Sequence, residues 1–189
     1  MAWNNANEIV VASNGQCYVA PVGTPLPASS VVALNAAFVG LGYATEDGAT
    51  LTVTPEVTDY MAWQSRSPVR REKVSQEIQI AIALMQWNEQ TVPVAFGGGV
   101  VSGSAGAYRY DLPKDDAALD ERAMILDAVD GAVHLRWVFP RGNVTEAVEA
   151  AFQRGAPASL PITFKALAPA ADASPGYFLT DSAGFAAGS

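Results

Sequence analysis

Any histidine-dependent catalytic or metal site in this chain would depend on one side chain, because His134 is its only histidine. A Ser-His-Asp triad, a cysteine–histidine pair and a histidine-bound metal each need an imidazole that the fold places against its partners. His134 falls in an alternating apolar segment, on the face opposite Leu135 and Trp137. A solvated or interface histidine is typical of such a position, so we expect no catalytic residue and no enzyme activity.

Residues that could hold phosphate, a metal ion or a glycan are present, but their context does not favour a site. Gly97–Gly99 is followed neither by a Gly-Lys-Ser/Thr run nor by the helix of a phosphate-binding loop. Asn143–Thr145 is a formal glycosylation triplet without a secretion signal. The carboxylates that could gather calcium are Asp115, Asp116, Asp120 and Glu121. They lack the spacing and the loop glycine of an EF-hand, so we expect a solvated turn, no metal and no cofactor.

One segment, Asp59–Lys73, carries side chains that favour binding. Its aromatic, methionine and arginine residues are Tyr60, Met61, Trp63, Arg66, Arg70 and Arg71. A tryptophan beside arginines can stack on bases and neutralise phosphates. The same residue types are enriched in the cores and hot spots of protein interfaces. A solvated loop is the third interpretation, but it would leave large apolar side chains in water.

The charge of the whole chain separates the first two interpretations. The formal net charge is −8, whereas proteins that grip nucleic acid gain affinity by neutralising phosphates with Lys and Arg. A basic tip on an acidic body can instead pair with acid on a second copy. We therefore favour self-contact for Asp59–Lys73. A contact between this tip and a different surface of the next copy would generate rings or open-ended filaments.

Two extended segments, Ala49–Thr58 and Val74–Leu84, must position this connection. Each alternates apolar with polar or small residues, which is typical of strands with one buried face. The apolar positions are Leu51, Val53, Val57, Val74, Ile78, Ile80, Ile82 and Leu84. The second segment also fits a helical stripe, but its Ile/Val content and the upstream Pro68 favour a strand. The sequence predicts a long hairpin whose connection projects roughly 23 Å.

Other elements follow from local patterns, and half of the residues are hydrophobic, enough for a core. Strands are expected at Gln16–Pro21, Tyr108–Leu112, Ala123–Val129, Val133–Phe139, Val144–Phe152 and Leu160–Ala166, with an Asp130-Gly131 hairpin turn. Short helices are expected from Ser29 or Ser30 to about Phe38 and within Trp87–Phe96, the latter capped by Asn88. The Gly/Ser-rich Val100–Ala107 is expected to be a mobile loop.

The predicted organisation is one domain with two arms. We expect an N-terminal arm at 1–15, a β-domain at 16–167 and a C-terminal arm at 168–189. Cys17 is the only cysteine, which excludes an intrachain disulfide. No signal peptide is visible, and prolines, glycines and polar residues interrupt the uncharged Ile9–Thr45, so no membrane span is expected. We expect this uncharged stretch to be buried or to lie against a neighbour.

Several short segments, in their order and spacing, resemble one known family. They are Ala20–Pro27 (APVGTPLP), Leu41–Gly48 (LGYATEDG), Ala62–Ser65 (AWQS), Val138–Glu146 (VFPRGNVTE) and Leu160–Phe164 (LPITF). Together they resemble the tail tube, or major tail, proteins of long-tailed phages that infect actinobacteria. The resemblance covers roughly residues 16–167.

This resemblance implies a mainly β fold. It implies two packed antiparallel sheets in a sandwich or barrel-like arrangement, with a flanking short helix, a long projecting hairpin and extended terminal arms. It also implies hexameric rings that stack into a hollow tube, with the long loop bridging successive rings. The tube would house the tape measure protein and later conduct double-stranded DNA without specific binding. Further implied partners are tail terminator and distal tail proteins, and the implied locations are the virion tail and, during assembly, the host cytoplasm.

The resemblance divides the long hairpin into two expected interfaces. The ring-stacking loop would use Tyr60, Met61, Trp63, Arg66, Arg70 and Arg71. The lumen would be lined by Thr52, Thr54, Glu56, Ser75, Glu77 and Gln79. These polar faces of the two strands contain no Lys or Arg, and an acidic or neutral wall lets phosphates pass. The alternatives are another virion β-sandwich, such as a tail terminator or decoration protein, and a carbohydrate-binding module.

Overall fold

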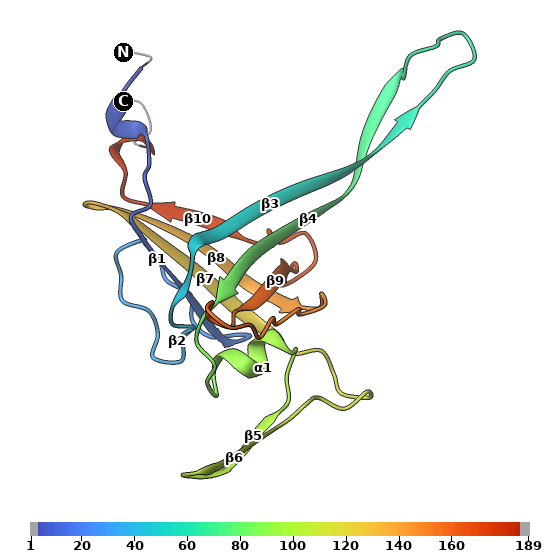
Figure 1. The fold of residues 1–189 in the computed structure, drawn as a ribbon. Coiled ribbons are helices and arrows are strands. Elements are labelled where there is room, and N and C mark those ends of the chain that lie inside the picture. The colour runs from blue at the N-terminus through green and yellow to red at the C-terminus, as the bar shows by residue number, and fades with distance from the viewer. Residues whose placement is uncertain (1–3, 186–189) are drawn as a thin grey trace.

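The computed structural model describes residues 4–185, and the outermost residues of both expected arms, 1–3 and 186–189, lie outside it. Strands dominate this part of the chain (Figure 1). The strands are β1 (Asn14–Pro21), β2 (Val39–Gly40), β3 (Ala44–Tyr60), β4 (Arg70–Leu84), β5 (Val100–Ser104), β6 (Ala107–Asp111), β7 (Glu121–Asp130), β8 (Val133–Val144), β9 (Leu160–Ala166) and β10 (Tyr177–Thr180). The short helix α1 spans Thr91–Ala95, and single 3₁₀ turns lie at Ala6–Glu8 and Ala183–Phe185.

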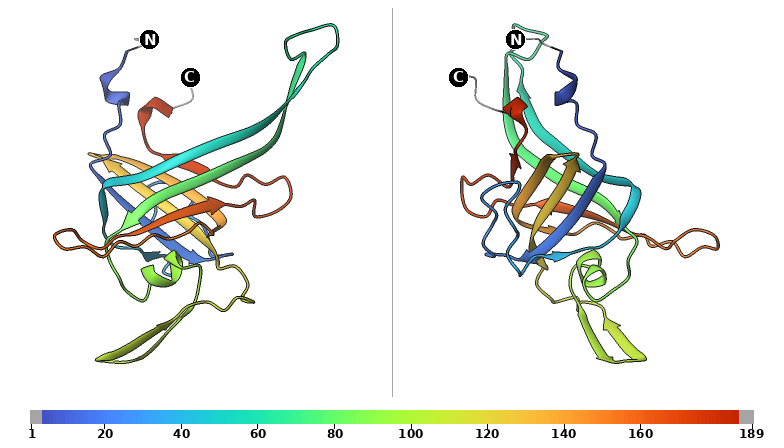
Figure 2. Two further views of the ribbon diagram at one scale, coloured as in Figure 1. Left: turned by 45° about the vertical axis from the view of Figure 1, so that its right-hand side comes forward. Right: turned by 90° about the vertical axis from the view of Figure 1, so that its left-hand side faces the viewer.

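Strand β8 joins two antiparallel layers. On one side it pairs with β7, from Val133 to Asn143. On its other side, Leu135–Val138 pair with β10 and Gly142–Val144 pair with β9. The first layer therefore contains β2, β1, β7, β8 and β10, and the second contains β9, β4 and β3. The hydrogen-bonded order is β2-β1-β7-β8-β9-β4-β3. One core unites the layers: Cys17, Val19, Met124 and Phe139 from the first pack with Ile80, Leu84, Ile162 and Phe164 from the second. The predicted fold class, mainly β with two packed antiparallel sheets, is confirmed (Figure 2).

The predicted helix from Ser29 or Ser30 to Phe38 is wrong, because this segment consists of bends and a turn. The side chain of Arg136, about a hundred positions away in sequence, binds backbone carbonyl groups that would accept hydrogen bonds within the helix. Arg136 Nη1 donates to the backbone oxygens of Ser29 (3.1 Å) and Val32 (2.8 Å). Helix nucleation is costly in so short a stretch. The segment is instead fixed by packing, since Leu26, Leu34 and Phe38 form a second cluster with Ala20, Ala123, Ile125 and Val138.

The second predicted helix exists as α1, and Asn88 caps it as expected. Asn88 Oδ1 accepts hydrogen bonds from the backbone N–H groups of Gln90 and Thr91, both at 2.9 Å. In the reverse direction, the backbone N–H of Asn88 donates to Thr91 Oγ1 at 3.1 Å. This is the reciprocal arrangement of a capping box, with Thr in place of Glu. Thr91 is fully buried, so the cap is also part of the core.

Removing this cap gives a first testable prediction. Asn88→Ala leaves two N–H groups without their acceptor, and we expect it to lower the free energy of unfolding by about 1 kcal/mol. Asn88→Asp keeps an acceptor oxygen at the same place and serves as the matched control. Urea unfolding followed by tryptophan fluorescence would measure both. Equal midpoints for the alanine and aspartate variants would show that the cap contributes nothing.

Two sequence predictions fail at connections. Val144–Phe152 is not a strand: residues 145–159 form an irregular crossing between the end of β8 and the start of β9. Val148 and Ala150 pack against the core, and the ring of Phe152 contacts that of Trp87 at a centroid distance of 5.1 Å. Conversely, the expected mobile loop contains β5, which pairs with β6 around an Ala105-Gly106 turn. The left-handed φ of 88° at Gly106 suits that turn.

The C-terminal segment docks on its own domain. Strand β10 pairs antiparallel with β8, so that Phe178 lies opposite Trp137 and Thr180 opposite Leu135. The ring centroids of Trp137 and Phe178 are 4.8 Å apart, and the ring of Phe185 contacts that of Phe178 in a tilted arrangement at 5.5 Å. The aromatic residues of this segment therefore close one edge of the first layer. Strand β9 has the bounds expected from the sequence. A tight hairpin joins β7 to β8 as predicted, but its two loop residues are Gly131 and Ala132, because Asp130 still pairs with Val133.

Candidate self-assembly interface

The β3–β4 hairpin projects far beyond the body of the molecule (Figure 1). Strand β9 pairs with β4 only from Gln79 to Leu84. The preceding residues of β4, Arg70–Ile78, pair with β3 alone. At about 3.4 Å per residue, this two-stranded ribbon extends roughly 30 Å. The predicted connection Asp59–Lys73 is too long, because the strands reach Tyr60 and Arg70 and leave only Met61–Val69 as the loop.

Apolar side chains along this ribbon lie open to solvent. Val53, Val57 and Val74 are 49%, 46% and 62% exposed, and Trp63 at the tip is 100% exposed. A lone two-stranded hairpin is at best marginally stable in water. Exposed apolar side chains grouped in this way mark interaction sites. The ribbon therefore has the exposed apolar surface that is typical of an interaction site.

A β-bulge interrupts the alternation that the sequence predicts. Glu56 lies opposite Ser75, but Val57 lies opposite Lys73, so Val74 has no directly opposed residue. Directly opposed residues share a face, and Lys73 therefore takes the place beside Val57 that the sequence assigned to Val74. Bulges increase the local twist of a ribbon. The tip beyond Val57 is consequently turned relative to the stem.

The predicted stacking residues separate into paired and unpaired groups at the tip. Arg71 holds Asp59 through Nε–Oδ1 and Nη2–Oδ2 contacts of 2.6 and 2.9 Å, and this bond lowers the pKa of the Asp59 carboxyl. Arg70 lies 3.8 Å from Glu72. Within residues 4–185, Arg66 makes no ion pair. The side chains available to a partner are therefore the exposed Tyr60, Met61 and Trp63, and the cation of Arg66.

The six predicted lumen residues form three directly opposed pairs on one face of the hairpin stem. The pairs are Thr52 with Gln79, Thr54 with Glu77, and Glu56 with Ser75. Ser75 Oγ donates to Glu56 Oε2 at 2.7 Å. On the opposite face, Leu51 and Val53 lie across from Ile80 and Ile78. The stem thus separates a polar face from an apolar one.

Sequence reasoning missed a cation on this polar face. Lys165 of β9 lies opposite Gln79 and bridges two carboxylates, Glu77 at 3.3 Å and Glu146 at 3.0 Å. These hydrogen bonds raise the pKa of Lys165 and lower that of Glu146. The face therefore contains a lysine, although two carboxylates surround it. The alternation of β9, with Ile162 and Phe164 in the core, is the signal that could have placed Lys165 outward.

The outer edge of β3 has no partner strand. It ends the hydrogen-bonded order, and within residues 4–185 nothing pairs with this side of its 17 residues. The other end of the order is β2, which has only two residues. A long free edge is a template for pairing with another chain. The hairpin therefore offers backbone hydrogen bonds sideways as well as side chains at its tip.

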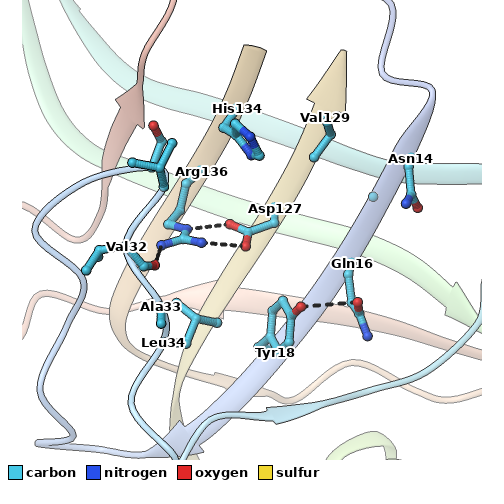
Figure 3. Close-up of a pocket in the computed structure, with 13 residues that line it drawn as sticks. Asn14, Gln16, Tyr18, Val32, Ala33, Leu34, Asp127, Val129, His134 and Arg136 are labelled. Carbon is cyan, nitrogen blue, oxygen red and sulfur yellow. Dashed lines mark hydrogen bonds and ion pairs between the residues drawn. The ribbon is translucent and has the colours of Figure 1, made fainter. Parts of the chain in front are cut away.

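His134 lies at a surface pocket (Figure 3). The pocket, of about 410 Å³, is formed between β1, β7, β8 and residues 30–34. Its charged groups already have partners, because Arg136 binds Asp127 through contacts of 2.6 and 2.8 Å. Among residues 4–185, the imidazole of His134 makes no side-chain hydrogen bond. Its backbone N–H donates to Asp181 at 2.7 Å.

Two of the four carboxylates considered for calcium are in ion pairs within the chain. Asp120 pairs with Arg122 at 2.7 Å, and Glu121 pairs with Arg141 at 2.8 Å. Asn143 is buried, which leaves no room for a glycan. In the described part of the chain, no three His, Cys, Asp or Glu side chains gather as metal ligands. No helix within residues 4–185 is long and apolar enough to span a membrane.

Comparisons with known proteins address the identity of the chain. A model of the family described as "Phage tail tube protein" matches residues 1–188. A solved structure titled "Virion of native gene transfer agent (GTA) particle" is 11% identical, covers 79% of this chain and 92% of its own, and has a TM-score of 0.37. A search of curated proteins gave no match.

Proposed function

The chain belongs to the phage tail tube protein family and is a structural component of a phage tail, and from this premise we propose that its copies form hexameric rings that stack into the tail tube. The observation that carries the proposal is the exposed two-stranded ribbon. Its valines and the fully exposed Trp63 need a covering partner. A second copy of the chain can be that covering partner, so no other protein is needed. The motifs quoted from the sequence also lead us to propose an actinobacterial host.

Lateral contacts close the ring in this proposal. The free edge of β3 pairs with a strand of the neighbouring copy, which removes the long unpaired edge. The hairpin stems of all copies then form a continuous wall. A closed wall needs no other protein to protect it, and the tip beyond the stem remains available for the next ring. Ring formation and stacking therefore use different parts of one hairpin.

The polar face of the stem lines the lumen in this proposal. It presents Thr52, Thr54, Glu56, Ser75, Glu77 and Gln79. The single neighbouring lysine, Lys165, is held by Glu77 and Glu146. Such a wall repels phosphates, so double-stranded DNA passes without being retained. The same lumen houses the tape measure protein before ejection, and the tube ends contact tail terminator and distal tail proteins. Assembly takes place in the host cytoplasm.

Charge reversal on this face tests the lumen assignment. Glu56→Lys with Glu77→Lys adds cations to the wall and frees Lys165 from one carboxylate. We expect tubes to form but DNA release to slow at least about tenfold, because each added phosphate contact strengthens retention. Release from purified virions, triggered and followed by a DNA-binding dye, would measure this.

The matched control is Asp115→Lys with Asp116→Lys, the same charge change on an exposed loop outside the hairpin. Normal release from the control shows that charge alone does not impair the virion. Normal genome delivery by the Glu56→Lys, Glu77→Lys virion would count against the lumen assignment.

Sedimentation velocity separates tube formation from the alternatives. A tail terminator or decoration protein predicts discrete rings or monomers, and a carbohydrate-binding module predicts a monomer at all concentrations. The tube proposal predicts a ring-sized species at low concentration that gives way to ever larger species as the concentration rises. A single boundary that does not change with concentration would overturn the proposal.

A further inference from the structure

A second exposed apolar feature lies at the end of the molecule opposite the hairpin tip. It is a groove of about 590 Å³ between α1 and the β5–β6 hairpin, which we name the α1/β5 groove. Its main lining residues are Trp87, Glu89, Val92, Val101, Tyr108 and Tyr110. In Figures 1 and 2, β5 and β6 extend away from the body in one direction and the β3–β4 tip in the other. One molecule thus presents a protruding tip and a groove at its two ends.

The walls of the groove are held in place, while its surface remains open. Trp87 Nε1 donates to the Ala158 carbonyl at 3.0 Å. Tyr110 Oη donates to the Gly98 carbonyl at 2.6 Å. Tyr108, by contrast, is 73% exposed. A preformed pocket with rigid aromatic walls is the kind of site in which interface hot spots bind. It therefore suits a large, flat apolar side chain.

The charges at the two ends are complementary. Glu89 lines the groove, and within residues 4–185 it makes no ion pair. At the tip, Arg66 is the arginine that no carboxylate neutralises in the described chain. The other cation at the groove, Arg109, already binds Asp111 through its Nε at 2.7 Å. The groove thus offers an uncompensated carboxylate to an uncompensated guanidinium.

We propose that the α1/β5 groove receives the β3–β4 tip of a second copy, with Trp63 between Tyr108 and Trp87 and Arg66 against Glu89. This inference rests on the proposed function and adds the receiving surface. The volume of the groove lies within the range of pockets that enclose a drug-sized ligand, which accommodates an indole with the neighbouring Met61 side chain. The contact joins unlike surfaces, so it repeats without closing. Every ring therefore points in the same direction along the tube.

Site-directed cross-linking tests the contact. One variant carries Gln64→Cys beside Trp63, and the other carries Tyr108→Cys in the groove. The native Cys17 is buried, and burial raises the pKa of its thiol to about 12, so it stays out of the reaction. Mixing the two variants under assembly conditions and oxidising them should give a disulfide-linked dimer. A mixture of Gln64→Cys with Val31→Cys, an exposed position away from the groove, should give none.

A charge swap provides a second test of the groove contact. Arg66→Glu and Glu89→Arg, made separately, should each raise the critical concentration for tube formation about tenfold, as expected for losing an interfacial charge pair. The double variant should restore it. Tubes from wild-type protein without the dimer and without the rescue would overturn the groove contact and leave the proposed function intact.

Two other outcomes would also overturn the contact. In virions, a Tyr108→Cys thiol that cross-links to a different tail protein would assign the groove to that partner. Failure of the wild-type protein to polymerise under any condition would remove both the contact and the proposed function.

Discussion

Replacing Trp63 and Arg66 together by alanine is expected to abolish tube formation while leaving the monomer folded. Trp63 is fully exposed in the single chain, so its truncation removes no intramolecular packing. In an interface a buried tryptophan is a typical hot spot, and its loss costs about 2–4 kcal/mol. That cost raises the critical concentration for stacking roughly 30-fold or more. Tubes should disappear at concentrations at which the wild-type protein polymerises fully.

Light scattering and electron microscopy would measure the tubes, and thermal unfolding would verify the fold. Val31→Ala with Arg154→Ala removes an exposed apolar side chain and an exposed arginine outside the hairpin, and this control should polymerise normally. The position of the loop at the end of a roughly 30 Å ribbon explains why it affects stacking more than stability. Full-length tubes from the Trp63→Ala, Arg66→Ala protein would refute the stacking role.

Arg136→Ala should have the largest effect on the stability of the fold. The residue is only 6% exposed and binds Asp127 through two contacts of 2.6 and 2.8 Å. It also donates to the backbone oxygens of Ser29 and Val32. Its removal leaves a partly buried carboxylate and two carbonyl groups without their donor. We expect a loss of about 3 kcal/mol, near the lower end of the range for breaking a buried pair, since Asp127 retains some solvent contact.

Urea unfolding would measure the loss, with Arg154→Ala as the exposed-arginine control. A double variant, Arg136→Ala with Asp127→Ala, should lose less than the sum of the two single variants, because it leaves no unpaired charge. Limited proteolysis should show earlier cleavage within residues 22–38, the segment that Arg136 holds. An unfolding midpoint for Arg136→Ala equal to that of Arg154→Ala would contradict this role.

The parts of the fold that depend on local pattern could be predicted from the sequence. The alternation in β3 and β4 placed Thr52, Glu56 and Glu77 on one face, and they are paired there. The capping box at Asn88 follows from residues three apart. Val74 has no directly opposed residue because a bulge, which the hydrophobic period does not reveal, shifts the register and places Lys73 opposite Val57. Residues 29–38 fail as a helix because the residue that holds their carbonyls, Arg136, is about a hundred positions away in sequence.

The same distinction applies to the candidate interface. The composition of the tip pointed to a partner, and the exposure of Trp63 agrees with that interpretation. The role of Lys165 depends on β9 being the neighbour of β4, which sequence alone does not give. The α1/β5 groove lies between a helix and the β5–β6 hairpin. The Gly/Ser-rich composition of Val100–Ala107 predicted a mobile loop in place of this hairpin. Sites formed by segments that are distant in sequence could be identified only once the fold was known.

The most direct test of the account is electron microscopy of the purified protein at increasing concentration. The exposed ribbon, the free edge of β3 and the groove at the opposite end predict rings that stack into long, hollow tubes. All rings of a tube should point in the same direction. The number and length of the tubes should rise steeply above a critical concentration. A protein that remains monomeric, or that forms discrete rings without stacking, at every concentration reached would contradict the central claim.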